Sequence, residues 1–185
     1  MLEFCYELPY EELDFTDPDT RPLYRIGRGE QGVLLVRPYT NDICAHWRFV
    51  NENAASKSAN KIYSMFCEYR EHGDFIGMDM ARKFLEMGFT RARRYANHHD
   101  GRKYTETGEV RPQETDALHC EKSAAAKVFK GIRDKAAYDP EYQQLRKQWR
   151  ANESTNATRV DTLAVSSNVT RSRYSRKRNN VLRRT

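Results

Sequence analysis

The residues best suited to chemistry in this sequence are a group of basic side chains near its middle. Guanidinium groups bind phosphate through two parallel hydrogen bonds, so arginines gathered in one place favour a phosphorylated partner. Tyr95 and Tyr104 are interleaved with them, as in surfaces that stack nucleic-acid bases. Only two acidic residues lie in this stretch, so its seven basic side chains leave a net charge of +5. The pattern predicts an anion-binding surface, and the alternative is a solvated face whose arginines pair with acids elsewhere. The basic residues are Arg82, Lys83, Arg91, Arg93, Arg94, Arg102 and Lys103.

Two short helices are expected to position these side chains. Met80, Phe84 and Met87 recur at a helical spacing, which predicts the first helix. Gly88 stands where a helix-ending glycine is typical, and Thr90 fits the N-cap of the second helix. The first turn of that second helix would offer free backbone N–H groups beside the arginines, so Thr90 joins the predicted phosphate-binding residues. The basic side chains are expected to point outward.

The order of a helix, a glycine and a second helix is also that of a helix-turn-helix. In that motif the positions taken here by Lys83 and Arg94 hold buried apolar side chains. These two misfits weigh against a DNA-reading helix-turn-helix, although they leave a basic helical surface in place.

A glycine-rich turn near the N-terminus is the second candidate for phosphate binding. Gly27, Arg28, Gly29, Glu30 and Gly32 form a GxGxxG pattern. A dinucleotide-binding fold needs a helix after such glycines, whereas a β-branched apolar run follows here. We therefore expect strand, turn and strand, with the glycines serving a structural hairpin, and we keep a phosphate-binding loop as the alternative. Kinase motifs that would accompany such a loop are absent from the sequence.

Histidine and carboxylate pairs offer proton-transfer chemistry. His98 and His99 are adjacent, but adjacent histidines rarely bind one ion and the only other plausible ligands nearby in the sequence are His119 and Cys120, so we expect no metal site. Asp74 and Asp79 are better explained as a loop residue and a helix-start residue than as a catalytic pair. The four cysteines are scattered without CxxC spacing, which is typical of reduced thiols. We expect no cofactor.

The expected fold is α+β and helix-rich, with a small antiparallel sheet in residues 22–50 packed on four or five helices. Apolar residues at helical spacing predict a helix over residues 55–69, and a weaker pattern predicts one over residues 116–138. Asp139 and Pro140 have the types expected at the N-cap and first position of a further helix.

The chain divides by composition into three parts. Residues 1–20 are an acidic, aromatic arm, residues 21–150 a single globular domain, and residues 151–185 a disordered basic tail. The tail carries the whole net charge of +6, because the first 150 residues are neutral overall. Its basic run at residues 171–178 is typical of a nuclear-localisation or nucleic-acid-binding segment. No apolar run reaches membrane length and no signal peptide is evident, so we expect a cytoplasmic, or through this run nuclear, protein without membrane association.

Several long motifs resemble the family catalogued as domain of unknown function 4385, over roughly residues 15–150. The resemblance implies a grouping, and it supplies no activity, cofactor or site residues. The motifs are YRIGRGEQGVLL at 24–35, HWRF at 46–49, GDF at 73–75, GMDMARKFL at 77–85, TRARRYAN at 90–97 and GRKY at 101–104.

Two functions fit these residues. The first is a nucleic-acid or polyanion-binding module that uses the Arg-rich helical surface and the tail, with steep salt dependence. The alternative is a small enzyme or ligand-binding protein for a phosphorylated or nucleotide metabolite, which requires Arg28, Glu30, Arg91 and Arg94 to converge in a pocket. A protein-interaction subunit that docks through its N-terminal arm is a third interpretation. The sequence leaves oligomeric state and any catalytic activity open.

Overall fold

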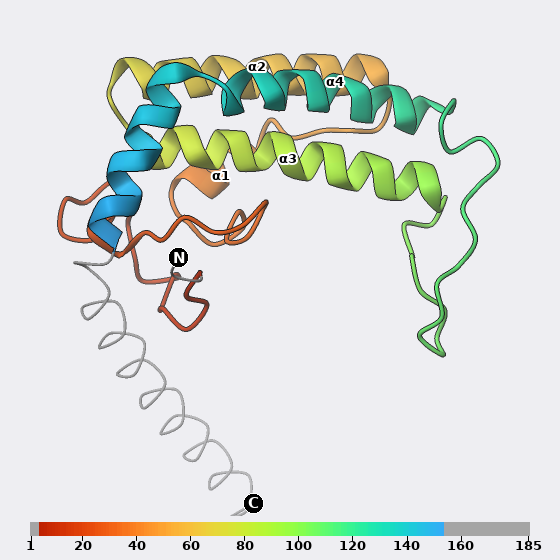
Figure 1. Ribbon diagram of the computed structural model, residues 1–185, viewed down its shortest axis with the longest axis horizontal. Coiled ribbons are helices and arrows are strands. Elements are labelled where there is room, and N and C mark those ends of the chain that lie inside the picture. Colours follow the sequence, from red (N-terminus) through yellow and green to blue (C-terminus); the bar gives the residue numbers. More distant parts are fainter. Residues whose placement is uncertain (1–3, 154–185) are drawn as a thin grey trace, which may run out of the picture.

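The computed structural model describes residues 4–153, and these residues form a helical protein (Figure 1). After the last labelled helix a further helix, here called the C-terminal helix, spans residues 140–153. No helix among the described residues is both long enough and apolar enough to cross a membrane. The labelled helices are the 3₁₀ turn η1 Arg21–Leu23, α1 Tyr39–Cys44, α2 Glu52–Glu71, α3 Phe75–Asn97 and α4 Glu121–Ala137.

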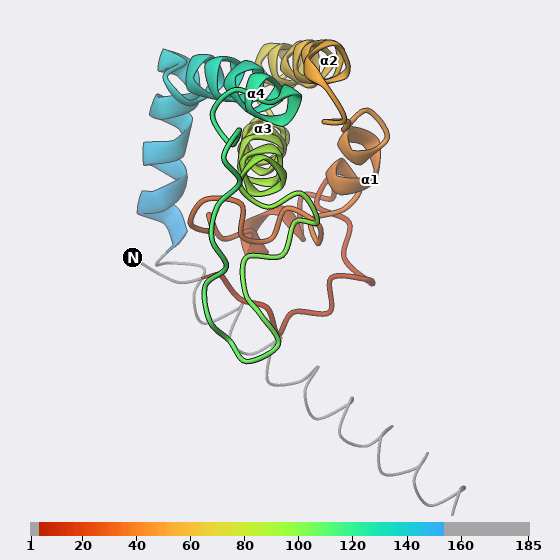
Figure 2. The ribbon, with the colours of Figure 1, turned by 90° about the vertical axis from the view of Figure 1, so that its right-hand side faces the viewer.

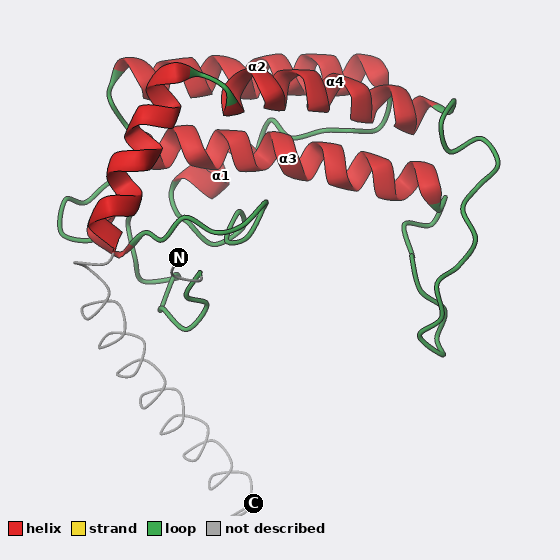
Figure 3. Cartoon of the chain, viewed as in Figure 1, coloured by secondary structure: helices red, strands yellow, loops and turns green. Residues whose placement is uncertain are grey.

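The prediction of an α+β fold is wrong, because residues 4–153 contain no sheet (Figure 3). The expected strands of residues 22–50 are turns, η1 and α1 instead. Val33 and Val36 are buried while Leu34 is 51% exposed, so the apolar side chains recur at a turn-like spacing of three and not in strand alternation. The backbone is satisfied locally, because Val33 N donates to the carbonyl of Glu30 at 3.1 Å and Leu35 N to that of Gly32 at 3.0 Å. One isolated bridge, between Tyr104 and Val110, is the nearest approach to a strand pair in the described residues.

Helix α3 is the central element of the fold. In the view along α3 in Figure 2, α2 and α4 lie on one side of it and the N-terminal segment on the other. Helix α3 packs against α1, α2 and α4. A surface helix shows one apolar stripe, whereas six consecutive residues of α3, from Phe75 to Met80, are all buried. The core of the protein is therefore built around this helix.

The two short helices expected on either side of Gly88 are in fact one helix. Gly88 lies inside α3 because α4 approaches it closely: a Cβ atom on Gly88 would lie 2.5 Å from Phe129 Cε1. Thr90 is likewise not an N-cap, since its hydroxyl donates to Glu30 Oε2 at 2.9 Å from the middle of the helix. The glycine serves helix packing, so no free N–H groups are available near Thr90 for an anion.

The two glycines of this helix pair should respond in opposite directions to alanine. We expect Gly88→Ala to lower the free energy of unfolding by about 1–3 kcal/mol, because its methyl group overlaps the buried ring of Phe129. Gly131→Ala is the matched control: Gly131 lies on the exposed side of α4, where an added Cβ would meet no atom within 4 Å, so the substitution should add about 0.5–1 kcal/mol. Urea unfolding of the two variants measures both changes, and equal effects would contradict the close helix approach.

The segments at both ends of the described chain close over the first half of α3. Phe4, Tyr10 and Phe15 of the N-terminal arm are buried in the common core. From the C-terminal helix, Trp149 stacks on Phe75 with ring centroids 5.1 Å apart and donates its Nε1 hydrogen to the carbonyl of Tyr24 at 3.0 Å. The C-terminal helix continues beyond residue 150. The predicted basic run at 171–178, and the disorder expected of the tail from residue 154 onward, lie outside the described residues.

Candidate anion-binding pocket

A buried group of charges on α3 forms the base of the candidate site. Asp79 and Lys83 are both 0% exposed, and the Arg82 side chain is 12% exposed. Arg82 and Lys83 follow Asp79 by three and four residues, so all three lie on the same face of the helix. The Asp79 carboxylate is 3.0 Å from the Arg82 guanidinium and 3.4 Å from Lys83 Nζ. The expectation that Arg82 and Lys83 point outward is therefore wrong: both turn towards a buried carboxylate.

Two tyrosines from distant parts of the chain complete the coordination of Asp79. Tyr142 of the C-terminal helix donates its hydroxyl to Asp79 Oδ1 at 2.6 Å, and Tyr24 donates to Oδ2. Burial alone would raise the pKa of Asp79, but the charges of Arg82 and Lys83 and these hydroxyls outweigh it and hold the pKa well below its ordinary value. Asp79 is thus a fixed negative charge inside the protein.

Lys83 occupies an apolar environment with three polar partners. Besides Asp79, its Nζ donates to the hydroxyl of Tyr24 at 3.0 Å and to the carbonyl of Gln31 at 2.9 Å. The rings of Phe4 and Tyr24 also lie 5.5 Å and 5.2 Å from Nζ. Burial lowers the pKa of Lys83 to about 8, although Asp79 acts in the opposite direction. Lys83 therefore cross-links the N-terminal segment to α3 and is not available to a surface ligand.

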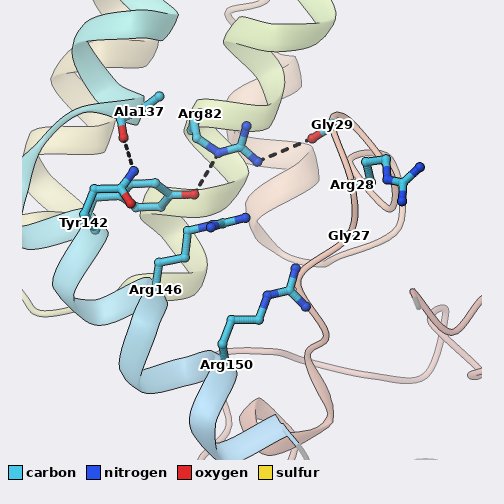
Figure 4. Close-up of a pocket in the computed structure, with 9 residues that line it drawn as sticks. Gly27, Arg28, Gly29, Arg82, Ala137, Tyr142, Arg146 and Arg150 are labelled. Carbon is cyan, nitrogen blue, oxygen red and sulfur yellow. Dashed lines mark hydrogen bonds between the residues drawn. The ribbon is translucent and has the colours of Figure 1, made fainter. Parts of the chain in front are cut away.

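Beside this buried group lies a pocket of about 370 Å³ between α3, the 27–29 turn and the C-terminal helix. Figure 4 shows Arg82, Arg146 and Arg150 reaching from the two helices towards the turn that carries Arg28. The lining residues are Gly27, Arg28, Gly29, Arg82, Ala137, Tyr142, Gln143, Arg146 and Arg150.

Two of the four arginines are held by the protein itself. Arg82 donates to the hydroxyl of Tyr142 at 2.8 Å and to the carbonyl of Gly29 at 3.4 Å, in addition to its pairing with Asp79. Arg150 lies 2.7 Å from the Glu153 carboxylate and donates to the carbonyl of Ile26 at 2.8 Å. These contacts fix both guanidinium groups before any ligand arrives.

The other two arginines have no such partners. The guanidinium groups of Arg28 and Arg146 make no hydrogen bond or salt bridge within residues 4–153. Arg28 is exposed on the turn, and Arg146 is half-buried in the pocket wall. Among the described residues no acidic side chain lines the pocket: Asp79 lies behind Arg82, and Glu153 behind Arg150. Of the four guanidinium groups, Arg28 and Arg146 are therefore left without a carboxylate partner, while Asp79 is shared between Arg82 and the buried Lys83.

The glycine turn takes part in this pocket as a turn and not as a strand hairpin. Gly29 has φ +57°, a left-handed conformation that suits glycine, and its Cβ position is open. Arg28 N donates to Gln31 Oε1 at 2.8 Å, which ties the turn together. Gly32, with φ +79°, lies instead against the ring of Phe4. Of the five residues of the predicted phosphate loop, Gly27, Arg28 and Gly29 line the pocket, whereas Glu30 and Gly32 do not.

The remaining basic residues of the predicted surface lie outside the pocket lining. Arg93 is engaged inside the protein, where it donates to the carbonyl of Ala117 at 2.9 Å and to Asn97 Oδ1 at 2.7 Å. The other four have more exposed side chains: Arg91, half-exposed, and Arg94 on α3, with Arg102 and Lys103, both exposed, in the loop that follows. The expected convergence of Arg28, Glu30, Arg91 and Arg94 is not found, since Arg28 alone of the four lines this pocket.

The carboxylates and histidines noted in the sequence have structural surroundings. Asp74 caps α3 through Gly77 N at 3.3 Å and pairs with Arg21 at 2.8 Å. His98 is buried, and the exposed His99 lies 3.5 Å from Asp116. Within residues 4–153 no group of three or more His, Cys, Asp or Glu side chains could hold a metal ion.

Sequence reasoning missed the contribution of the C-terminal helix. Tyr142, Arg146 and Arg150 follow one another at intervals of four, which places them on one face. The spacing of Arg146 and Arg150 after Tyr142 could have indicated that two arginines share a helix face with a buried tyrosine. Nothing in the sequence indicated that this face would lie opposite Gly27–Gly29.

The comparisons with known proteins give a family and no function. A family model described as Domain of unknown function (DUF4385) matches residues 5–152. No curated protein and no solved structure matches the chain significantly. Any functional conclusion must therefore come from the geometry of the pocket.

Proposed function

The chain belongs to the DUF4385 family, and we propose that it binds a small phosphorylated ligand in the arginine pocket. The observation that carries this proposal is the pair of unpartnered guanidinium groups, Arg28 and Arg146, at a pocket whose other two arginines are already held in place. An anion in the pocket would supply a counter-charge and accept hydrogen bonds from the free guanidinium of Arg146, and the exposed Arg28 on the facing turn adds a second free charge.

The repulsion between the arginines of the pocket supports the proposal. Like charges in one concave site repel each other, and low-dielectric walls strengthen the field that attracts a counter-ion. Arginine is the side chain that best matches phosphate geometry. The pocket volume of about 370 Å³ is at the small end of ordinary ligand sites. The ligand is accordingly a small molecule, and Arg82 and Arg150 bind it with little loss of side-chain freedom.

Nucleic-acid binding is a second candidate, favoured by the exposure of Arg94, Arg102 and Lys103 and the partial exposure of Arg91. It ranks below the pocket because Lys83, Arg82 and Arg93, three of its seven basic side chains, are committed to contacts inside the protein. A role for the basic tail, and a cytoplasmic or nuclear location, remain predictions of the sequence.

Removing Arg146 should weaken phosphate binding at least tenfold. We expect Arg146→Ala to raise the Kd for pyrophosphate by about 10- to 100-fold, because a hydrogen bond to a charged group contributes roughly 1.5–3 kcal/mol. Isothermal titration calorimetry on the full chain measures the change. Arg94→Ala is the matched control, since it removes the same charge from the exposed surface of α3 outside the pocket.

The same two variants separate the candidates when short DNA and RNA strands replace pyrophosphate. A loss of oligonucleotide binding in Arg94→Ala, with pyrophosphate binding unchanged in Arg146→Ala, would transfer the function to the exposed surface. Equal weakening in both variants would indicate general charge attraction and would overturn the pocket proposal.

A further inference from the structure

We infer that the ligand of the arginine pocket is the phosphate monoester of a small polyhydroxylated molecule, as in a sugar phosphate, and not a nucleotide. This inference rests on the proposed function, because it names the class of ligand for the same site. Three properties of the pocket carry it: its charge, the lack of an aromatic platform, and a neutral amide in its wall.

The charge of the site matches a single phosphate monoester. Arg82 and Arg150 are paired with Asp79 and Glu153, so Arg28 and Arg146 are the two guanidinium groups of the lining without a carboxylate partner; Lys83, which shares Asp79, is buried behind the pocket and does not line it. A phosphate monoester carries about −1.5 to −2 at neutral pH, which neutralises such a pair. Diphosphates and triphosphates bring additional negative charge for which the pocket has no free cation.

The walls of the pocket are unsuited to a nucleobase. Bases are bound by stacking on exposed aromatic rings or arginine planes and in apolar slots. Tyr142, the aromatic residue of the described lining, is 1% exposed, and its hydroxyl is occupied by Asp79 and Arg82. The arginine planes are needed for the phosphate. Tyr138 is 80% exposed but is not part of the lining.

A neutral amide in the wall suits hydroxyl groups instead. Gln143 lies on the first turn of the C-terminal helix, and one hydrogen of its Nε2 is donated to the carbonyl of Ala137. Its Oε1 and second N–H hydrogen are left for a ligand, and a hydroxyl both donates and accepts. Figure 4 places this turn of the helix, with Tyr142 and Ala137, at the opposite end of the pocket from Arg150. A phosphate beside Arg146 and Arg150 therefore leaves the body of the ligand near Gln143.

Calorimetry with a matched set of probes tests the ligand class. We expect the full chain to bind ribose 5-phosphate or glucose 6-phosphate at least tenfold more tightly than inorganic phosphate, AMP or pyrophosphate. Tighter binding of AMP or pyrophosphate than of both sugar phosphates would overturn the inferred class and leave the anion pocket standing. Absence of binding by every phosphate probe would overturn both the class and the proposed function.

The Gln143→Ala variant tests the part played by the amide. It should weaken the sugar phosphate by about three- to tenfold, the effect of one neutral hydrogen bond, and leave inorganic phosphate unchanged. Gln144→Ala is the control, because Gln144 is the exposed neighbour outside the lining, and it should change neither affinity. Equal weakening of inorganic phosphate and sugar phosphate by Gln143→Ala would show that the amide does not contact the hydroxylated body, and would contradict the inference.

Discussion

Replacing Asp79 by alanine is expected to lower the free energy of unfolding by about 3–5 kcal/mol. The change leaves Lys83 and Arg82 buried without their counter-ion, and breaking a buried ion pair by removing one partner typically costs this much. It also removes the acceptor of the Tyr24 and Tyr142 hydroxyls. Against a total stability of roughly 5–15 kcal/mol, much of the fold's margin would be lost. Urea unfolding followed by tryptophan fluorescence measures the loss.

A surface carboxylate provides the control for this prediction. Glu71 is exposed at the end of α2, so Glu71→Ala should change the stability by no more than about 0.5 kcal/mol. If Asp79→Ala cost as little as Glu71→Ala, Asp79 could not be the counter-ion that holds the charges of α3 inside the protein.

The position of Asp79 shows why the direction of the basic side chains was predicted incorrectly. A sequence of mixed charges and apolar residues suggests that the charges face solvent, and for most helices that is correct. Here α3 is enclosed by α2, α4 and the N-terminal segment, so every residue of its first two turns, from Phe75 to Ala81, is buried (Figure 2). Arg82 and Lys83 follow Asp79 at helical spacing, which the sequence does show. That Asp79 is itself buried depends on Tyr24 and Tyr142, which lie far away in the chain.

Local signals predicted the helices more reliably than they predicted their packing. Apolar spacing over residues 55–69 indicated α2, and Asn51 caps it through Ala54 N at 2.9 Å. Pro140 marks the start of the C-terminal helix as expected. The prediction that Gly88 ends a helix was wrong because glycine is favoured in two situations, at a helix end and at a close contact between two helices. Only the position of Phe129 distinguishes them.

Only part of the candidate site could be predicted from the sequence, because local motifs can be recognised there and long-range packing cannot. Gly27, Arg28 and Gly29 form a recognisable local motif, although their interpretation as a strand hairpin was wrong. Arg146 and Arg150 belong to the same pocket but are separated from that motif by almost the whole domain. Residue types near one another in the chain suggested phosphate binding, whereas the pocket itself is produced by long-range packing of the C-terminal helix.

Alkaline pH should unfold the protein through its buried tyrosines. Tyr10, Tyr24, Tyr39 and Tyr142 are each at most 7% exposed, and burial raises the pKa of each well above its ordinary value near 10. Above pH 10 the unfolded chain releases these protons and the folded protein keeps them. Their stabilisation is therefore complete below pH 10 and is lost as the pH rises towards the folded pKa values.

The free energy of unfolding should fall with pH steeply enough to unfold the protein. Each tyrosine that ionises only in the unfolded chain removes about 1.4 kcal/mol per pH unit, so four remove about 5–6 kcal/mol. A domain with a stability of roughly 5–15 kcal/mol should then unfold within about one to three pH units above pH 10. Free energies of unfolding in urea across this range measure the slope.

The titration of Lys83 changes the free energy of unfolding in the direction opposite to that of the tyrosines, and a Lys83 variant therefore provides a control for the pH profile. Its folded pKa of about 8 lies below the ordinary value of 10.5, so between these values the unfolded chain binds more protons and stability rises with pH. We expect a modest rise from pH 8 towards pH 10, followed by the steep fall caused by the tyrosines. Lys83→Met should abolish the rise and leave the fall. Tyrosinate absorbance should appear together with unfolding, whereas ionisation of all the tyrosines near pH 10 in a folded protein would show that the four rings are open to water.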